Sequence, residues 1–177
     1  MARIAMLVGE DFEDVEFRKP FNRLKQRGHT VELLGAREGH TVHGKRGEEK
    51  VDIERAVSNV DPQAYDALVI PGGYGPDHLR MDHDVVDFVR RFGRTQRPIA
   101  AVCHGPQLLI EADLVRDRTV TSWPSVKTDL ENAGARWVNE TVVQDGPLIT
   151  SRNPDDLDAF VDALQQRLQP GAHAKSA

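Results

Sequence analysis

Short runs of hydrophobic residues alternate along the chain with longer segments in which hydrophobic residues recur every three or four positions. Uninterrupted short runs are typical of buried strands, and the longer spacing is typical of helices that bury one face. The short runs predict strands at 4–8, 30–34, 67–70, 99–102, 119–123, 136–138, 142–143 and 148–149. The longer segments predict helices at 16–27, 85–92, 126–133, around 108–110 and from 154 to 164.

Turn residues mark several boundaries of these elements. Gly28 and Gly134 each follow a predicted helix, where glycine commonly ends the helix. Asn153 is placed to cap the last helix, and Asp145-Gly146 predicts a two-residue hairpin turn. The segment 35–47 has no clear period and predicts loops with room for a short hairpin.

The alternation of strand and helix predicts an α/β fold with a mostly parallel central sheet and helices on both faces. Residues 1–168 are interpreted as a single domain, and residues 169–177, which have nothing apolar to bury, as a disordered tail. Binding sites in such folds lie beyond the carboxyl ends of the strands.

Composition narrows the class of protein. Of the 177 residues, 39% are hydrophobic and 29% charged, and the formal net charge of −5 comes from residues of both signs. This predicts a globular cytoplasmic protein, with no basic cluster for nucleic acid and no run of roughly 20 apolar residues for a membrane span. One cysteine cannot form an internal disulfide, which fits a reducing compartment.

Cys103 is the strongest candidate for chemistry. A lone cysteine is more often a small buried hydrophobe. Here, however, the apolar run 99–102 leads into Cys103-His104-Gly105-Pro106, which resembles a strand-to-helix nucleophile elbow. The positive end of the following helix is expected to lower the pKa of the thiol and favour the thiolate. The pattern predicts a thiolate nucleophile.

Pro71-Gly72-Gly73 lies at the end of another predicted strand, so its loop and the Cys103 loop are expected to converge on one site. Gly72 and Gly73 could be ordinary turn glycines, or they could let backbone amides approach a reacting carbonyl. We favour the second interpretation, with the amide of His104 as a further oxyanion donor and its ring as a candidate base.

An acidic run follows the first predicted strand. Most of it is interpreted as a solvated loop and an acidic first helical turn. One carboxylate from this run could tune the thiol or shuttle a proton, and the spacing alone leaves Glu13 and Glu16 as alternatives.

Metal and phosphate sites are weaker interpretations. His40 and His43 are three residues apart, and His78 and His83 are five apart, but no recognised zinc spacing with a second cysteine occurs. The glycines form neither a P-loop nor a dinucleotide fingerprint. We predict no metal and no cofactor.

Five short motifs in one order give the chain a specific resemblance. Together they resemble the PfpI family of intracellular cysteine proteases and deglycases, within the class I glutamine amidotransferase-like superfamily, over residues 3–168. The motifs are Phe-Glu-Asp-Val-Glu at 12–16, Pro-Gly-Gly at 71–73, Cys-His-Gly-Pro-Gln at 103–107, Thr-Ser-Trp-Pro at 121–124 and Asn-Ala-Gly-Ala at 132–135.

The resemblance implies a flavodoxin-like sandwich and a set of site residues. It implies that Cys103 is the nucleophile with His104 as its partner, that Glu16 lies close to the thiol, and that Gly73 and His104 supply oxyanion amides. In family members a catalytic carboxylate comes from a neighbouring subunit of a homodimer or hexamer. Its position here is Asp77, where archaeal members carry glutamate. Trp123 stands where relatives often have tyrosine, beside the expected substrate.

Three functions follow as alternatives. The first is a stress-related cysteine-dependent hydrolase that acts on glyoxal-derived carbonyl adducts of proteins or nucleotides. The second is an intracellular cysteine peptidase, which would need an oxyanion hole and an acid for the leaving amine. The third is a non-enzymatic stress holdase or an oxidant sensor that cycles Cys103 to sulfenic acid.

Overall fold

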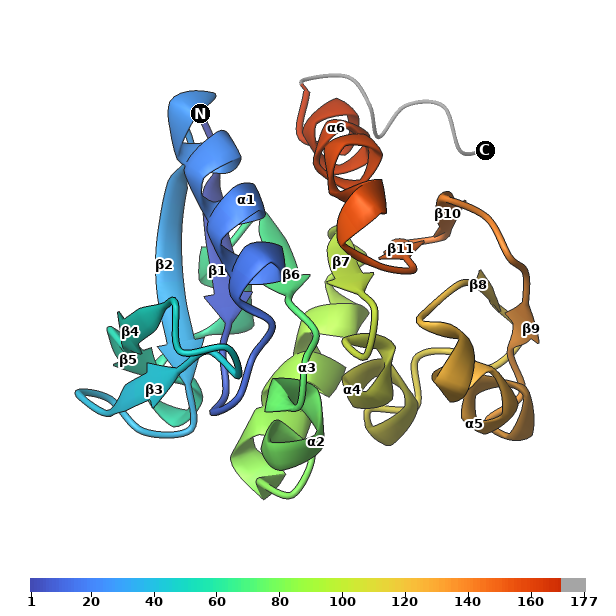
Figure 1. Cartoon of the computed structure of the whole chain (residues 1–177), viewed down its shortest axis with the longest axis horizontal. Coiled ribbons are helices and arrows are strands. Elements are labelled where there is room, and N and C mark those ends of the chain that lie inside the picture. Colours follow the sequence, from blue (N-terminus) through green and yellow to red (C-terminus); the bar gives the residue numbers. More distant parts are fainter. Residues whose placement is uncertain (170–177) are drawn as a thin grey trace.

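The computed structural model describes residues 1–169 and contains a seven-stranded central sheet (Figure 1). The order of its strands is β10-β11-β7-β6-β1-β2-β5, and only the β10–β11 pair is antiparallel. The strands are β1 (Arg3–Leu7), β2 (Thr30–Gly35), β5 (Arg55–Ala56), β6 (Ala67–Ile70), β7 (Ile99–Val102), β10 (Val142–Asp145) and β11 (Leu148–Ser151). The predicted flavodoxin-like α/β fold is confirmed.

Helices cover both faces of this sheet (Figure 1). Helices α1 (Asp14–Gln26) and α6 (Leu157–Arg167) pack on one face, where they share one hydrophobic core. The opposite face is covered by α3 (His83–Arg94), α4 (Pro106–Glu111) and α5 (Lys127–Asn132), which contribute to a second core. The sheet is therefore buried between two layers of helices.

The central strands are apolar throughout because both of their faces are buried. In β6, Leu68 and Ile70 pack into the core under α3 and α4, whereas Ala67 and Val69 pack into the core under α1 and α6. Strands buried on both faces show continuous hydrophobic runs instead of polar alternation. The short runs in the sequence were therefore sufficient to locate these strands.

The segment 119–123 was predicted as one strand, but only its first two residues form a strand. Strand β8 contains only Thr119–Val120, and it pairs with β9 (Arg136–Trp137) in a separate two-stranded sheet. The chain leaves the extended conformation after Val120 because Trp123 donates its backbone amide to the carbonyl of Cys103, at 3.0 Å, and a 3-10 turn (Pro124–Val126) follows. These contacts place Trp123 beside the Cys103 loop.

The hairpin between β3 (Thr41–His43) and β4 (Lys50–Asp52) is antiparallel and closes through the turn 44–49. The sequence predicted loops with room for a hairpin in part of this region. The prediction missed β5, which has two residues, and α2 (Gly75–Leu79), which has five. Elements this short show no hydrophobic period.

The C-terminal helix begins later than predicted. Asn153 accepts a hydrogen bond from the amide of Asp155, so it does act as a cap, but the element that it caps is a 3-10 turn (Pro154–Asp156) before α6. Two further 3-10 turns are Val57–Asn59 and Pro62–Ala64. The predicted disordered tail lies, apart from Gln169, outside the described residues. Within residues 1–169 no helix is both long and apolar enough to cross a membrane.

Candidate active site

Cys103 occupies a strained turn between β7 and α4. Its φ angle is +62°, a value that L-residues other than Asn and Asp rarely adopt. The turn is held on both sides, because the amide of Cys103 donates to the carbonyl of Ser151 and its carbonyl accepts from Trp123, each at 3.0 Å. A Cβ atom at Gly105 would lie 2.7 Å from the carbonyl of Ile70, so the elbow requires glycine there. The nucleophile-elbow geometry predicted from the sequence is present.

The Cys103 loop and the Pro71–Gly73 loop meet, because β6 and β7 are neighbouring parallel strands. The backbone amides of His104 and Gly73 lie beside the sulfur of Cys103 and lower the pKa of its thiol. Within the described residues neither amide donates to a backbone carbonyl. Two amides are thus available to stabilise negative charge beside the nucleophile.

Gly72 sits at the point of closest approach in this site. A Cβ atom there would lie 2.4 Å from Oε2 of Glu16 and 2.8 Å from Cβ of Cys103. The amide of Gly72 instead donates to Oε2 of Glu16 at 2.8 Å. Glycine at this position lets the carboxyl group and the cysteine lie side by side.

Glu16 projects from the first turn of α1 into the interior, and its side chain is fully buried. Among residues 1–169, its Oε1 atom has no hydrogen-bond partner. Burial raises the pKa of Glu16 to about 8. The hydrogen bond from the amide of Gly72 lowers this pKa, and the negative charge of Glu13 raises it. Glu16 is therefore mostly a neutral carboxylic acid at pH 7.

The pKa of the Cys103 thiol is raised in the structure, whereas the sequence led us to expect a lowered pKa. Burial of the sulfur raises the thiol pKa, and the nearby carboxylate of Glu16, when ionised, raises it further. The amides of His104 and Gly73 lower it, as a helix start was expected to do, but burial outweighs them. The prediction of a thiol acidified by the helix end is therefore wrong. Below about pH 8 Glu16 is mostly neutral, so its charge no longer raises the pKa of Cys103.

His104 lies beside Cys103. Its Nδ1 atom is 3.3 Å from the sulfur of Cys103, and its Nε2 atom is 3.4 Å from Oγ of Ser125. Burial lowers the pKa of His104, the positive charge of Lys45 lowers it further, and Asp77 opposes them. The ring is thus uncharged at pH 7 and can accept a proton. Asp77 lies on the exposed side of α2 and forms no hydrogen bond with His104.

Glu13 and Glu16, which the sequence left as alternatives, have different positions. Glu16 lies beside Cys103, whereas Glu13 lies against Lys45 and Arg46. There Oε2 of Glu13 is 2.7 Å from Nζ of Lys45, and its Oε1 is 3.1 Å from Nε of Arg46. Both carboxylates contribute to one site with separate contacts.

These groups line a cavity of about 410 Å³. Its size suits a small substrate. Trp123, expected beside the substrate, forms part of the wall and is 42% exposed. The full lining consists of Glu13, Glu16, Lys45, Arg46, Gly73, Tyr74, Cys103, His104, Trp123 and Pro154.

Three residues at this cavity were not predicted from the sequence: Lys45 and Arg46, which line it, and Asp14, which holds their turn in place. Asp14 is fully buried and accepts hydrogen bonds from the amides of Arg46, Glu48 and Glu49 at 2.8–2.9 Å. A Cβ atom at Gly44 would lie 2.0 Å from Oδ1 of Asp14. Asp14 thus shapes the turn 44–49. The acidic run around Asp14 was visible in the sequence, but nothing in it pointed to this turn.

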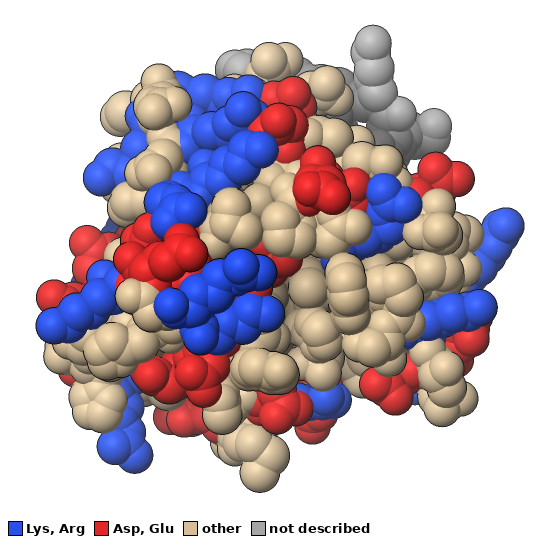
Figure 2. All heavy atoms as spheres, viewed as in Figure 1, with Lys and Arg blue, Asp and Glu red and all other residues tan. Residues whose placement is uncertain are grey.

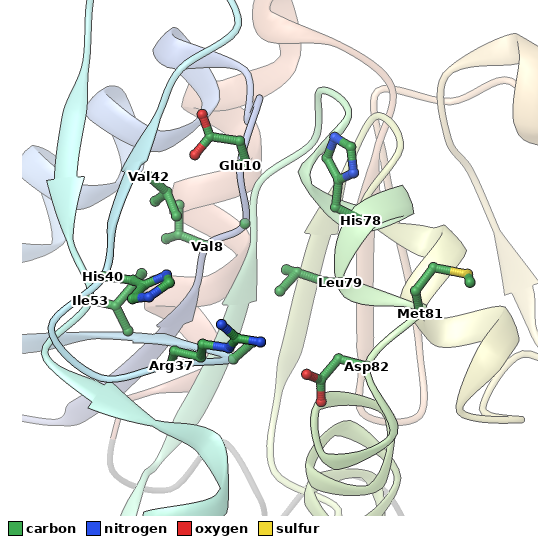
Figure 3. A pocket seen from close by; sticks show the side chains of 12 residues that line it. Val8, Glu10, Arg37, His40, Val42, Ile53, His78, Leu79, Met81 and Asp82 are labelled. Atoms are coloured by element: carbon green, nitrogen blue, oxygen red, sulfur yellow. The ribbon is translucent and has the colours of Figure 1, made fainter.

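A second cavity, of about 430 Å³, lies at the same edge of the sheet (Figure 3). Its floor is apolar, and Figure 3 shows polar side chains around it, from the loops after β1 and β2 on one side and from the α2 region on the other. His40 and His78, which were considered as metal ligands, both lie here. Among residues 1–169, no group of three or more His, Cys, Asp or Glu side chains is arranged to hold a metal ion.

The fold and the elbow together define a class: a flavodoxin-like α/β protein with a cysteine at the strand-to-helix turn beside a buried carboxyl group. Residues 2–167 match the DJ-1/PfpI family, and the chain belongs to that family. The resemblance seen in the sequence is confirmed.

Two curated relatives are similar over most of their length. The chain is 45% identical over 159 residues to "Protein/nucleic acid deglycase 2" of Escherichia coli, which covers 89% of this chain and 92% of that protein. It is 43% identical over 158 residues to "Putative cysteine protease YraA" of Bacillus subtilis, which covers 89% and 93% of the two chains.

Solved structures show the same fold. A two-domain protein from Anabaena variabilis, with DJ-1/ThiJ/PfpI-like and ferritin-like domains, has a TM-score of 0.93 and 39% identity. That match covers 100% of this chain but 52% of the other, so this chain spans about half of it. Drosophila melanogaster DJ-1beta has a TM-score of 0.86 and 28% identity, with 94% and 89% covered.

Proposed function

We propose that this protein is a cysteine-dependent hydrolase that removes glyoxal-derived adducts from amines or thiols. The observation that carries the proposal is the meeting of Cys103, the neutral carboxyl group of Glu16 and two free amides in one small cavity. The similarity to a protein named as a deglycase supports it.

The reaction needs three steps. The sulfur of Cys103 bonds to the former aldehyde carbon of the adduct, and the amine or thiol leaves with a proton. A proton then moves between the two adjacent carbons, which converts the enzyme-bound hydroxyketone into a thioester. Water hydrolyses the thioester, releases lactate from a methylglyoxal adduct, and restores the Cys103 thiol. No redox partner is needed, because the ketone is reduced as the neighbouring carbon is oxidised.

Glu16 suits the proton transfers in this sequence. A carboxyl group with a pKa of about 8 can both give and take a proton near neutral pH. As an acid it donates a hydrogen bond to the thiolate, and as a base it can take the proton from carbon. The amides of Gly73 and His104 stabilise the oxyanion that forms in thioester hydrolysis.

A peptidase is the second candidate, favoured by the 3.3 Å contact between the sulfur of Cys103 and Nδ1 of His104. A cysteine-histidine pair can attack an amide. The third group of a triad is not supplied by Asp77 of the same chain, which is exposed and has no hydrogen bond to His104. The peptidase proposal therefore includes a homo-oligomer in which a partner supplies Asp77. An Asp77→Asn variant that keeps full peptide cleavage would contradict it.

The deciding experiment is product analysis. Purified protein and Cys103→Ser are incubated with the methylglyoxal adduct of N-acetylcysteine, and lactate is followed by NMR. We expect lactate from the wild type and a loss of at least about 1,000-fold in Cys103→Ser. A fluorogenic peptide and an aggregating client are tested in parallel. Lactate no faster than the variant's background, with client protection retained, would instead support the holdase.

A further inference from the structure

Two cations, Lys45 and Arg46, line the Cys103 cavity beside one carboxylate, that of Glu13. Lys45 and Arg46 both contact Glu13, whose side chain is 6% exposed. The 2.7 Å contact with Lys45 already pairs this carboxylate. Within the described residues, Arg46 uses only Nε in its ion pair, and its two terminal nitrogens have no hydrogen-bond partner. The side chain of Arg46 is 62% exposed and lines the cavity, so these donors are accessible to a ligand.

The two cations are held in place by the fold. Consecutive residues of a surface turn would usually be free to point elsewhere. Here the three amide contacts of Asp14 fix the backbone of turn 44–49, and Glu13 holds the two side chains. Lys45 also lies over the ring of Tyr74, with Nζ 5.7 Å from the ring centre. A fixed pair of cations loses little entropy when it binds a ligand.

The other residues that line the cavity do not neutralise the positive charge of Lys45 and Arg46 at pH 7. Glu16 is mostly neutral, and the ring of His104 is uncharged. With Cys103 as a thiol, the lining therefore carries one net positive charge. Figure 2 shows that Lys and Arg side chains gather on the side of the molecule formed by α1 and the β3–β4 hairpin. Several of those on α1 are paired with acidic residues, as Arg18 is with Glu48 and Glu49.

We propose that Lys45 and Arg46 form an anion-binding subsite, so that the preferred substrates are carbonyl adducts that carry a phosphate or carboxylate group. Planar guanidinium groups bind both anions through paired hydrogen bonds. The statement about substrates rests on the proposed function, whereas anion binding beside Cys103 does not. The experiment therefore has one arm for each.

The first arm measures charge preference at the nucleophile without turnover. Cys103 is alkylated with iodoacetate and with iodoacetamide, which differ in charge, and the rate ratio is normalised to free cysteine. We expect the ratio to favour iodoacetate and to fall about fivefold in Arg46→Gln, since one charge at a partly exposed site contributes about 1 kcal/mol. Lys45 still pairs Glu13 in that variant. Arg18→Gln removes a cation outside the cavity and should change the ratio less than about twofold.

The second arm compares substrates that differ only in charge. The methylglyoxal adduct of deoxyguanosine monophosphate is compared with that of deoxyguanosine, and the adduct of N-acetylcysteine with that of its methyl ester. We expect kcat/KM to favour each anionic substrate about fivefold over its neutral partner, and this ratio to fall to near one in Arg46→Gln. A preference for only one anion identifies the phosphate or the carboxylate as the recognised group.

The outcomes separate the two proposals. If no adduct is turned over but the alkylation ratio depends on Arg46, the deglycase proposal fails and the subsite stands. If the wild type alkylates with the ratio of free cysteine, or Arg46→Gln leaves the ratio unchanged, the subsite is disproved. Thermal unfolding of Arg46→Gln at the wild-type temperature excludes a general loss of structure.

Discussion

Two cavities of nearly equal size lie at one edge of the sheet, and they differ in the groups that line them. The Cys103 cavity, of about 410 Å³, brings together a cysteine, a buried carboxyl group and two backbone amides beside the sulfur. The other, of about 430 Å³, has an apolar floor and a polar rim. Its Glu10 contacts His43, its His78 contacts Asp11, and its Asp82 caps α3.

The difference lies in how the polar groups are used. In the second cavity, these three side chains bond to neighbouring side chains or to the backbone. In the Cys103 cavity, among residues 1–169, Oε1 of Glu16 has no hydrogen-bond partner and the amides of Gly73 and His104, which lower the pKa of the Cys103 thiol, donate to no backbone carbonyl. Cavity volume therefore does not distinguish a reactive site, whereas convergent unsatisfied groups around a buried sulfur do.

The largest expected difference between the two cavities is in how the free energy of unfolding changes as pH rises from 4.5 to 8. The pKa of Glu16 rises from an ordinary 4.5 to about 8 in the folded state, and at 1.36 kcal/mol per pH unit this corresponds to about 5 kcal/mol. The unfolded chain ionises first, so the wild type should lose stability relative to Glu16→Gln as pH rises from 4.5 to 8. Urea unfolding at several pH values measures this.

The matched control is Glu10→Gln in the second cavity, where the carboxylate is 46% exposed. Its stability relative to the wild type should change by less than about 1 kcal/mol over the same range. Parallel stability curves for Glu16→Gln and the wild type would show that Glu16 titrates normally.

The next contrast compares two glycines. Gly72→Ala should push Glu16 and Cys103 apart, and a displacement of about 1 Å can lower turnover roughly 100-fold. Gly9→Ala meets Leu79 Cγ at 2.6 Å and the Gly75 carbonyl at 2.9 Å, so it is similarly crowded but lies in the second cavity. We expect Gly9→Ala to lower the melting temperature with much less effect on turnover. Equal losses of turnover would contradict the assignment of the site.

The smallest effect is expected from filling the second cavity. Ala36 lines it and is partly exposed, so Ala36→Leu should occupy the space with little strain. Lactate formation should stay within about twofold of the wild-type rate, as for surface substitutions generally. A loss of tenfold or more would show that this cavity takes part in the reaction.

The parts of the site that could be predicted from the sequence come from local patterns at strand ends. The run Ile99–Val102 followed by Cys-His-Gly-Pro defined the elbow, and Pro-Gly-Gly after Ala67–Ile70 defined its neighbour. Parallel strands bring such ends to one edge without further information. The fold followed from the same buried runs.

The parts that could not be predicted depend on tertiary contacts. Lys45 and Arg46 reach the cavity because Asp14, about 30 residues away, binds their turn. The pKa of Cys103 depends on burial and on Glu16, which the helix-end argument did not include. The choice between Glu13 and Glu16 likewise required knowing which side of α1 faces the sheet.

The central claim is that Glu16 acts on Cys103 as a neutral acid at pH 7. The most direct test is the rate of Cys103 alkylation by iodoacetamide at pH 7, followed by intact mass, in the wild type and in Glu16→Gln. A carboxylic acid is a stronger donor to a thiolate than an amide, so the variant should react about tenfold more slowly. If Glu16→Gln reacts faster, Glu16 is ionised and repels the thiolate, and the account is wrong.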